Sequence, residues 1–221
     1  MPAAHAGHVI LLHGIWMRGP ALLALERRLR GAGFATSRFE YASVFGTPAT
    51  AIARLRRQMR AQLDQPLHLL GHSLGGLLAI GACRDAEGLP VGRILCLGSP
   101  LAGSAVAREV VRWPGGSRVL GGAREVLLAG AGALPAGRDV GVIAGTLGRG
   151  LGRIAGGLSR PHDGTVAVGE TRVDGLADHL QLDVSHTGML FDARVADQAI
   201  AFLRNGRFVA GSTEHAGHGV R

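Results

Sequence analysis

The sequence predicts an α/β protein with a parallel central sheet that helices cover on both faces. Short, solidly apolar runs alternate with longer amphipathic segments through the first half of the chain. Gly and Pro residues punctuate the borders between these segments. Strands that are apolar on both faces are typical of parallel sheets, so we expect about six mostly parallel strands between two layers of helices.

The first elements are defined by their apolar positions and their end signals. Residues 8–12 form a short apolar run, which predicts the first strand. Pro20 opens a helix that Gly31 closes, with leucines at helical spacing on one face. Residues 34–41 are the next strand candidate.

An arginine-rich helix and two further strands follow. Thr47 and the proline after it are typical of an N-cap and a first helical turn, and Pro66 marks the end of that helix. Residues 67–70 predict the third strand. A helix over residues 73–86 and an apolar strand over residues 93–97 complete this half.

The pattern loosens in the second half, where Gly becomes dense. Residues 105–112 and 117–130 have the spacing of short amphipathic helices, and residues 140–146 predict another buried strand. The glycine-dense stretch 148–157 has no role that its residues indicate. A strand over residues 180–184 comes near the end of the chain.

The last helix begins at a cap, Asp192, and ends at Gly206. A single core can grow to roughly 250 residues, so a chain of 221 residues fits one domain. We expect that domain over residues 1–208, with residues 105–160 as a small cap or variable region. Residues 209–221 are expected to form a flexible tail.

Composition excludes several classes of protein. With 47% hydrophobic and 18% charged residues the chain is not disordered. The net charge of +8 comes from 24 basic residues that are all Arg and are spread along the whole chain. Only 4% of residues are aromatic, so stacking platforms for bases are scarce, and we expect no nucleic-acid partner.

The chain shows no signal peptide, so we expect a cytoplasmic protein. Residues 67–83 are too short and too rich in Gly and His for a membrane span, and stable membrane insertion is not expected. Cys83 and Cys96 fall in predicted core elements and are read as buried thiols without a disulfide. The histidines lack ligand spacing, so neither a metal nor another cofactor is expected.

A G-x-S-x-G pattern at residues 71–75 places Ser73 between a predicted strand and a predicted helix. This is the arrangement of a nucleophile elbow, a tight turn whose neighbouring positions must lack side chains. Because 36 of 221 residues are Gly, the pattern alone is a weak signal. Its position at the end of an apolar strand strengthens it.

Other loops at the same sheet edge carry the partners that a serine nucleophile needs. The first strand ends at a His-Gly pair, and the N–H of Ile15 in that loop and the N–H of Leu74 could form an oxyanion hole. Asp163 lies in a later loop, and His186 follows the last strand. The chain order Ser, Asp, His is that of an α/β hydrolase.

Alternative acid and base residues fit less well. Asp139 begins a strand and so lies at the opposite edge, whereas Asp174 and Asp178 fall close to the last strand. His179 lies inside the last strand pattern. The His13 side chain is expected to brace the oxyanion loop rather than transfer protons.

The chain resembles the α/β-hydrolase lipases and esterases, most closely the small lidless bacterial lipases. The resemblance rests on LLHGIW near the N-terminus, GHSLGG, LGSPLAGS, DGTV and SHTGML, and it covers residues 8–206 with a poorer match at residues 105–160. It implies a minimal α/β-hydrolase fold. It also implies that Ser73 is the nucleophile, His186 the general base and acid, and Asp163 its orienting carboxylate.

Apolar residues beside these loops are candidates for an acyl-binding wall. They are Trp16, Met17, Leu101 and Met189, with Leu190 beside the last of these. For Leu101 and Leu190 an ordinary core position is an equally good interpretation.

The sequence therefore predicts a serine esterase or lipase that acts on a small-molecule ester or lipid. An acyltransferase or thioesterase with the same triad and a non-catalytic binding module remain alternatives.

Overall fold

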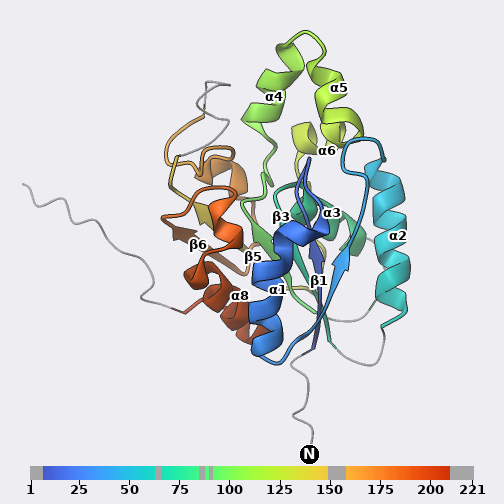
Figure 1. Cartoon of the computed structure of the whole chain (residues 1–221), viewed down its shortest axis with the longest axis vertical. Helices are drawn as coiled ribbons and strands as arrows, with labels where there is room; N and C mark the ends of the chain where they lie inside the picture. Colours follow the sequence, from blue (N-terminus) through green and yellow to red (C-terminus); the bar gives the residue numbers. More distant parts are fainter. Residues whose placement is uncertain (1–6, 63–65, 85–87, 90–91, 149–157, 210–221) are drawn as a thin grey trace, which may run out of the picture.

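The computed structural model describes residues 7–62, 66–84, 88–89, 92–148 and 158–209. Six strands form one parallel sheet in the order β2-β1-β3-β4-β5-β6 (Figure 1). The strands are β1 (His8–Leu12), β2 (Ala35–Phe39), β3 (Leu67–His72), β4 (Ile94–Leu97), β5 (Val140–Gly145) and β6 (Asp178–Leu182). The predicted parallel sheet is confirmed, and its C-terminal edge points upward in Figure 1.

Strand boundaries differ from the predictions in every strand after β1. β2 is shorter than residues 34–41, β4 and β5 differ by one residue at one end, and β3 and the last strand differ by two. β3 continues to His72, two residues past its predicted end, because its pairing with β4 extends to His72 and Leu97. The last strand begins at Asp178 rather than at residue 180 and ends at Leu182. It is an edge strand with half-buried positions, so its apolar run does not mark its ends.

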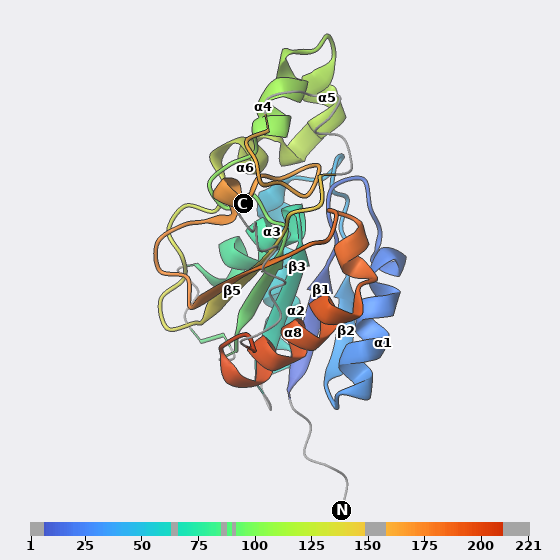
Figure 2. The ribbon, with the colours of Figure 1, turned by 90° about the vertical axis from the view of Figure 1, so that its left-hand side faces the viewer.

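Helices cover both faces of the sheet. α1 (Leu23–Gly31) and α8 (Ala193–Asn205) pack on one face, and α2 (Pro48–Arg60) and α3 (Leu74–Cys83) on the other. α1 and α8 lie side by side in both views (Figures 1 and 2). Cys83 and Cys96 are buried free thiols, as predicted.

β1 shows how one strand serves both cores. Its Val9 and Leu11 side chains pack with α1 and α8, and Ile10 and Leu12 pack with α2 and α3. All four are fully buried. Side chains alternate along a strand, so a solidly apolar run is needed to fill two cores at once.

The arginine-rich helix α2 is set by its first turn and its apolar stripe. The Thr47 side chain caps it by accepting a hydrogen bond from the Thr50 N–H, and a proline occupies the first helical position. Ala51, Leu55 and Met59 recur every four residues and are buried against the sheet. The arginines fall on the remaining surface, as the amphipathic spacing predicts.

The last helix, α8, begins and ends where its sequence signals predict. The Asp192 carboxylate accepts a hydrogen bond from the Arg194 N–H at 2.7 Å, which satisfies a free donor of the first turn. Gly206 ends the helix at a φ of +76°, a backbone conformation that favours glycine.

Three short helices stand above the C-terminal edge of the sheet (Figures 1 and 2). They are α4 (Ala105–Arg112), α5 (Gly116–Leu120) and α6 (Arg124–Ala129). The prediction of one helix over residues 117–130 is wrong, because a 3-10 turn (Gly121–Ala123) interrupts it. Gly121 has a φ of +53°, and a Cβ there would lie 2.1 Å from the Val44 carbonyl oxygen, so loop packing sets the break.

Further 3-10 turns connect the main elements, at Gly19–Leu22, Val168–Thr171 and Gly188–Leu190. The first of these replaces the beginning of the helix predicted from Pro20. Most of the glycine-dense stretch, residues 149–157, and the predicted tail beyond residue 209 lie outside the described residues.

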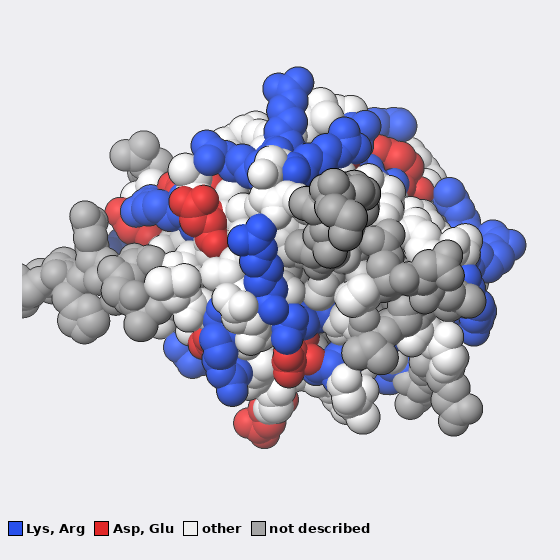
Figure 3. Space-filling view, turned by 90° about the horizontal axis from the view of Figure 1, so that it is seen from below, with Lys and Arg blue, Asp and Glu red and all other residues white. Residues whose placement is uncertain are grey.

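Arginines are spread over the lower face of the molecule rather than gathered in one patch, and acidic side chains lie among them (Figure 3). In the described part of the chain, no helix has both the length and the apolar character needed to cross a membrane.

Candidate active site

Ser73 occupies a strained turn between β3 and α3. Its backbone has φ +54° and ψ −119°, a conformation that is costly for a residue with a side chain. Its N–H donates to the Leu97 carbonyl at 2.9 Å, which ties the turn to β4. Ser73 is only 6% exposed, so it is buried rather than on an open surface.

The glycines of the motif allow the close approach that this turn requires. A Cβ on Gly71 would lie 2.3 Å from the Gly76 nitrogen, and one on Gly75 would lie 2.5 Å from the Leu12 carbonyl oxygen. Both contacts are with backbone atoms, which cannot rotate away. The tight turn between a strand and a helix that the sequence predicts is therefore present, and the role of Ser73 as a nucleophile stays a prediction.

His186 and Asp163 form a buried pair. The His186 Nδ1 lies 2.7 Å from the Asp163 Oδ2, and the carboxylate can only accept, so Nδ1 carries the proton. In the neutral ring, Nε2 is then the nitrogen with a free lone pair. Asp163 Oδ1 accepts two backbone N–H groups, from Thr165 at 2.8 Å and from Val166 at 2.7 Å. These bonds fix the carboxylate and offset the cost of its burial.

The elbow and the acid-base pair lie at the same edge of the sheet. The ring of His72, the residue before Ser73, has its centroid 4.6 Å from that of His186. A Cβ on Gly98, at the end of β4, would lie 3.0 Å from Asp163 Oδ2 and 3.1 Å from His186 Nδ1. The structure thus brings the three predicted triad residues into one region.

The loop after β1 also contacts His72 and Ser73. A Cβ on Gly14 would lie 3.0 Å from His72 Nδ1 and 3.2 Å from Ser73 Cβ. Ile15 follows in this loop, and Leu74 is the first residue of α3, where helical N–H groups have no partner within the helix. That the N–H groups of Ile15 and Leu74 bind an oxyanion stays a prediction.

His13 and Tyr41 hold that loop in place. The two rings stack with centroids 4.3 Å apart, and the Tyr41 hydroxyl donates to the His13 carbonyl at 2.5 Å. Burial raises the pKa of Tyr41, which keeps this donor protonated. Burial also lowers the pKa of His13, whose Nδ1 donates to the Gly14 carbonyl at 2.9 Å. These contacts support the expected bracing role of His13.

Trp16 is held in an unusual conformation within the loop after β1. Its φ of +58° makes it, with Ser73, one of two non-glycine residues with positive φ among the described residues. Its backbone N–H donates to the Ser43 hydroxyl at 3.2 Å, and its indole N–H donates to the Val119 carbonyl at 3.0 Å. The loop after β1 is thereby linked to α5.

The residues predicted to wall an acyl pocket fall into two groups. Trp16 and Met17 line an open groove of about 560 Å³ between the loop after β1 and residues 40–45. Leu101 and Met189 are instead 1% and 0% exposed and belong to the two hydrophobic cores. They line neither that groove nor the cavity beside Leu74, and their contact with substrate stays a prediction.

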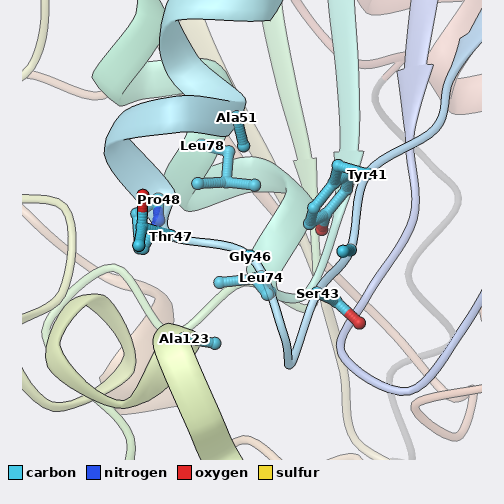
Figure 4. Close-up of a pocket in the computed structure, with 10 residues that line it drawn as sticks. Tyr41, Ser43, Gly46, Thr47, Pro48, Ala51, Leu74, Leu78 and Ala123 are labelled. Atoms are coloured by element: carbon cyan, nitrogen blue, oxygen red, sulfur yellow. The ribbon is translucent and has the colours of Figure 1, made fainter.

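The cavity beside Leu74 lies between α3, the start of α2 and the turn before α6 (Figure 4). Its volume is about 10 Å³, which is room for about one water molecule. It is lined mainly by apolar side chains, among them Tyr41, Ala51 and Leu78. An acyl chain does not fit into it without movement of its walls.

The alternative acids and bases lie elsewhere. Asp139 pairs with Arg93 at 3.0 Å, and Asp178 accepts from the Phe208 N–H at 2.8 Å. His179 contacts Thr171 at 2.8 Å, and burial lowers its pKa to about 4. Within the described residues, no group of three His, Cys, Asp or Glu side chains is placed to hold a metal ion.

His72 and Gly98 are site residues to which the sequence analysis gave no role. Gly98 has φ +54° and leaves space for the Asp163–His186 pair, and His72 contacts His186 directly. The position of Gly98 directly after an apolar strand is a sequence signal that points to it. No local signal marks the contact of His72, because its partner is 114 residues away in sequence.

Comparison with solved structures identifies the architecture. The chain superposes on a Bacillus licheniformis lipase in its mature form with a TM-score of 0.69, at 16% identity over 86% of this chain and 89% of the lipase. The chain has the α/β-hydrolase fold. A lipase-esterase related protein from Clostridium acetobutylicum gives a TM-score of 0.60 at 11% identity, covering 93% of this chain and 95% of that one.

The RedJ thioesterase from the prodiginine biosynthetic pathway of Streptomyces coelicolor is also similar. It gives a TM-score of 0.57 at 15% identity, over 92% of this chain and 87% of the thioesterase. No sequence model of a protein family matches the chain, and no curated protein matches it. At these identities the likeness establishes the fold alone.

Proposed function

We propose that this protein is a serine carboxylic-ester hydrolase that works through an acyl-enzyme on Ser73. The observation that carries the proposal is the 2.7 Å contact between Asp163 and His186 beside a serine in a strained elbow. A serine hydroxyl is a weak nucleophile until a neutral imidazole, fixed in one tautomer, takes its proton. The Asp163 contact selects the tautomer in which His186 Nε2 is free to do so.

The reaction follows from these positions. Ser73 Oγ forms a bond to the acyl carbon as its proton passes to His186 Nε2, and the carbonyl oxygen becomes an oxyanion. The C–O bond to the alcohol then breaks, and His186 gives the proton to the departing oxygen. Water attacks the acyl-enzyme by the same route, which releases the acid and restores Ser73. Neither a metal nor an organic cofactor is part of this scheme.

The oxyanion is assigned to the N–H groups of Ile15 and Leu74. Two features support this: Gly14 packs against Ser73, and Leu74 begins a helix, whose N-terminal end favours negative charge. A donor of this kind contributes about 3 to 4 kcal/mol of barrier lowering. Burial lowers the pKa of His13, which disfavours a positive charge on its ring beside the loop.

The substrate is proposed to be a small-molecule ester or lipid with a short to medium acyl chain. The cavity beside Leu74 is too small for a chain, whereas the groove lined by Trp16 and Met17 has a volume of about 560 Å³. Trp16 and Met17 are therefore the residues that we assign to substrate contact.

The test is hydrolysis of p-nitrophenyl butyrate by the wild-type protein and by Ser73→Ala. We expect the variant to lose more than about 99.9% of the activity, because a triad that lacks its nucleophile keeps only residual catalysis. Ser117→Ala, a serine of α5, is the matched control and should retain wild-type rates. Equal rates for wild type and Ser73→Ala would refute the proposal.

Thioester cleavage is a second candidate, favoured by the similarity to a structure described as a thioesterase. The same triad serves both reactions, since only the leaving group differs. Comparison of kcat/KM for a butyryl thioester of coenzyme A and for p-nitrophenyl butyrate separates the two. A thioester preference of more than about 10-fold would replace the esterase assignment.

A further inference from the structure

His72 is a buried side chain beside the nucleophile that the proposed reaction does not use. It ends β3, is 1% exposed and directly precedes Ser73. Its Nε2 lies 2.9 Å from the His186 carbonyl oxygen. A carbonyl only accepts, so this nitrogen carries the proton, and Nδ1 is the unprotonated one. Nδ1 is buried without a hydrogen-bond partner among the described residues.

The contact completes the anchoring of the base. The His186 N–H donates to the Asp163 carbonyl at 2.9 Å, its ring Nδ1 bonds the Asp163 carboxylate, and its own carbonyl accepts from His72. Two of these bonds tie His186 to the loop that carries Asp163. The third ties it to the strand that carries Ser73, and so relates the base to the nucleophile.

The charge state of His72 suits a position beside a base. When His186 takes the serine proton it becomes a cation, and a second cation nearby would oppose that step. Burial, and then the neighbouring charge of His186, lower the pKa of His72 to about 3. The other ionisable groups that act on it are Asp163 and His13. His72 is therefore neutral wherever an imidazole base can work.

We infer that His72 is a positioning residue, whose Nε2–H holds the backbone of His186 at a fixed distance from Ser73 while its ring stays uncharged. This inference rests on the proposed function, since it assigns His186 as the base. A displacement of about 1 Å at a reacting group can lower a rate by about 100-fold. Loss of this one hydrogen bond should thus reduce kcat without changing substrate affinity.

Two amide substitutions separate the hydrogen bond from the rest of the side chain. In His72→Gln the amide nitrogen can occupy the place of Nε2 and donate to His186, whereas in His72→Asn it falls short by one methylene. We expect His72→Gln to keep kcat within about 5-fold of wild type, and His72→Asn to lose about 100-fold with KM within about 2-fold. His72→Phe, an apolar variant without a donor, should behave like His72→Asn.

A control substitution on the same strand separates an effect on the position of His186 from an effect on protein stability. His68 is also buried in β3, and its Nδ1 accepts from the Arg93 N–H at 3.0 Å, far from the triad. His68→Phe should lower the free energy of unfolding and leave kcat unchanged. Urea unfolding of every variant confirms that the kinetic comparison is made on folded protein.

The pH dependence of kcat/KM provides a measurement that a change in protein stability alone would not alter. With His72 neutral, kcat/KM of the wild type should fall on acidification with the slope of one proton, and His72→Gln should have the same slope. A two-proton slope in the wild type that becomes one-proton in His72→Gln would show that His72 titrates and would overturn the inference.

The other possible results distinguish failure of the His72 inference from failure of the proposed esterase function. Wild-type kcat in both His72→Asn and His72→Phe, with Ser73→Ala inactive, overturns the positioning role and leaves the esterase function standing. Equal losses in His72→Gln and His72→Asn also overturn it, because the donor would then not matter. Full activity in Ser73→Ala overturns the proposed function itself.

Discussion

A methyl group at Gly75 tests the packing that holds the elbow against the oxyanion loop. It would lie 2.5 Å from the Leu12 carbonyl oxygen and 2.7 Å from the His13 carbonyl oxygen. Gly31, the last residue of α1, provides the matched control, since a methyl there meets nothing within 4 Å. Both glycines are helical, so both replacements by Ala gain helix propensity.

The two substitutions should change stability in opposite directions. Overpacking against rigid backbone costs about 1 to 3 kcal/mol, from which a helix-propensity gain of up to about 1 kcal/mol is subtracted. We expect Gly75→Ala to lower the free energy of unfolding by about 1 to 2 kcal/mol, and Gly31→Ala to raise it by about 0.5 kcal/mol. Urea unfolding measures both.

The same pair should differ in activity. Relief of the clash moves the start of α3 away from β1, which separates the N–H groups of Ile15 and Leu74. We expect kcat on p-nitrophenyl butyrate to fall by about 10-fold or more in Gly75→Ala and to stay unchanged in Gly31→Ala. Free energies of unfolding that agree within about 0.5 kcal/mol would refute the packing argument.

Three further variants test the acid, the site packing and the buried histidine. Asp163→Asn should lower kcat by about 10,000-fold because an amide no longer selects the required tautomer, whereas Asp139→Asn should keep wild-type kcat in the same esterase assay. Gly98→Ala, whose methyl would press on the Asp163 carboxylate, should lower kcat by about 10-fold or more, and wild-type kcat would contradict this contact. In the unfolded chain His72 takes up a proton below its ordinary pKa of 6.5, whereas in the folded protein its pKa is about 3. As the pH is lowered from 6.5 to about 3, the free energy of unfolding should therefore decrease by up to about 1.4 kcal/mol per pH unit. Urea unfolding across the window should show a shallower acid slope in His72→Gln, and equal slopes would speak against a neutral buried His72.

Local patterns in the sequence were enough to predict most of the fold. The solid apolar run of β1 predicts a strand that is buried on both sides, and the structure confirms it at the same residues. Thr47, Asp192 and Gly206 act through the backbone immediately beside them, so their capping signals were readable from sequence. The break at Gly121 was not, because it depends on packing against Val44, which is distant in the chain.

Among the residues of the candidate site, too, some have a local sequence signal and others do not. Ser73 stands in a motif whose steric reasons are local, and the chain order of Asp163 and His186 follows from the fold. Burial of Leu101 and Met189 in the cores could not be told from a position at a pocket wall, because an apolar residue in a loop carries the same signal in both cases.

A fluorophosphonate probe tests the central claim most directly, because it reacts with a serine only when its base and oxyanion donors activate it. Incubation followed by peptide mass spectrometry should show one modification per chain, on Ser73. The modification should be absent in Ser73→Ala and strongly slowed in His186→Ala. Folded wild-type protein that stays unlabelled, or that is labelled at another serine, would contradict the assignment and favour a non-catalytic binding module.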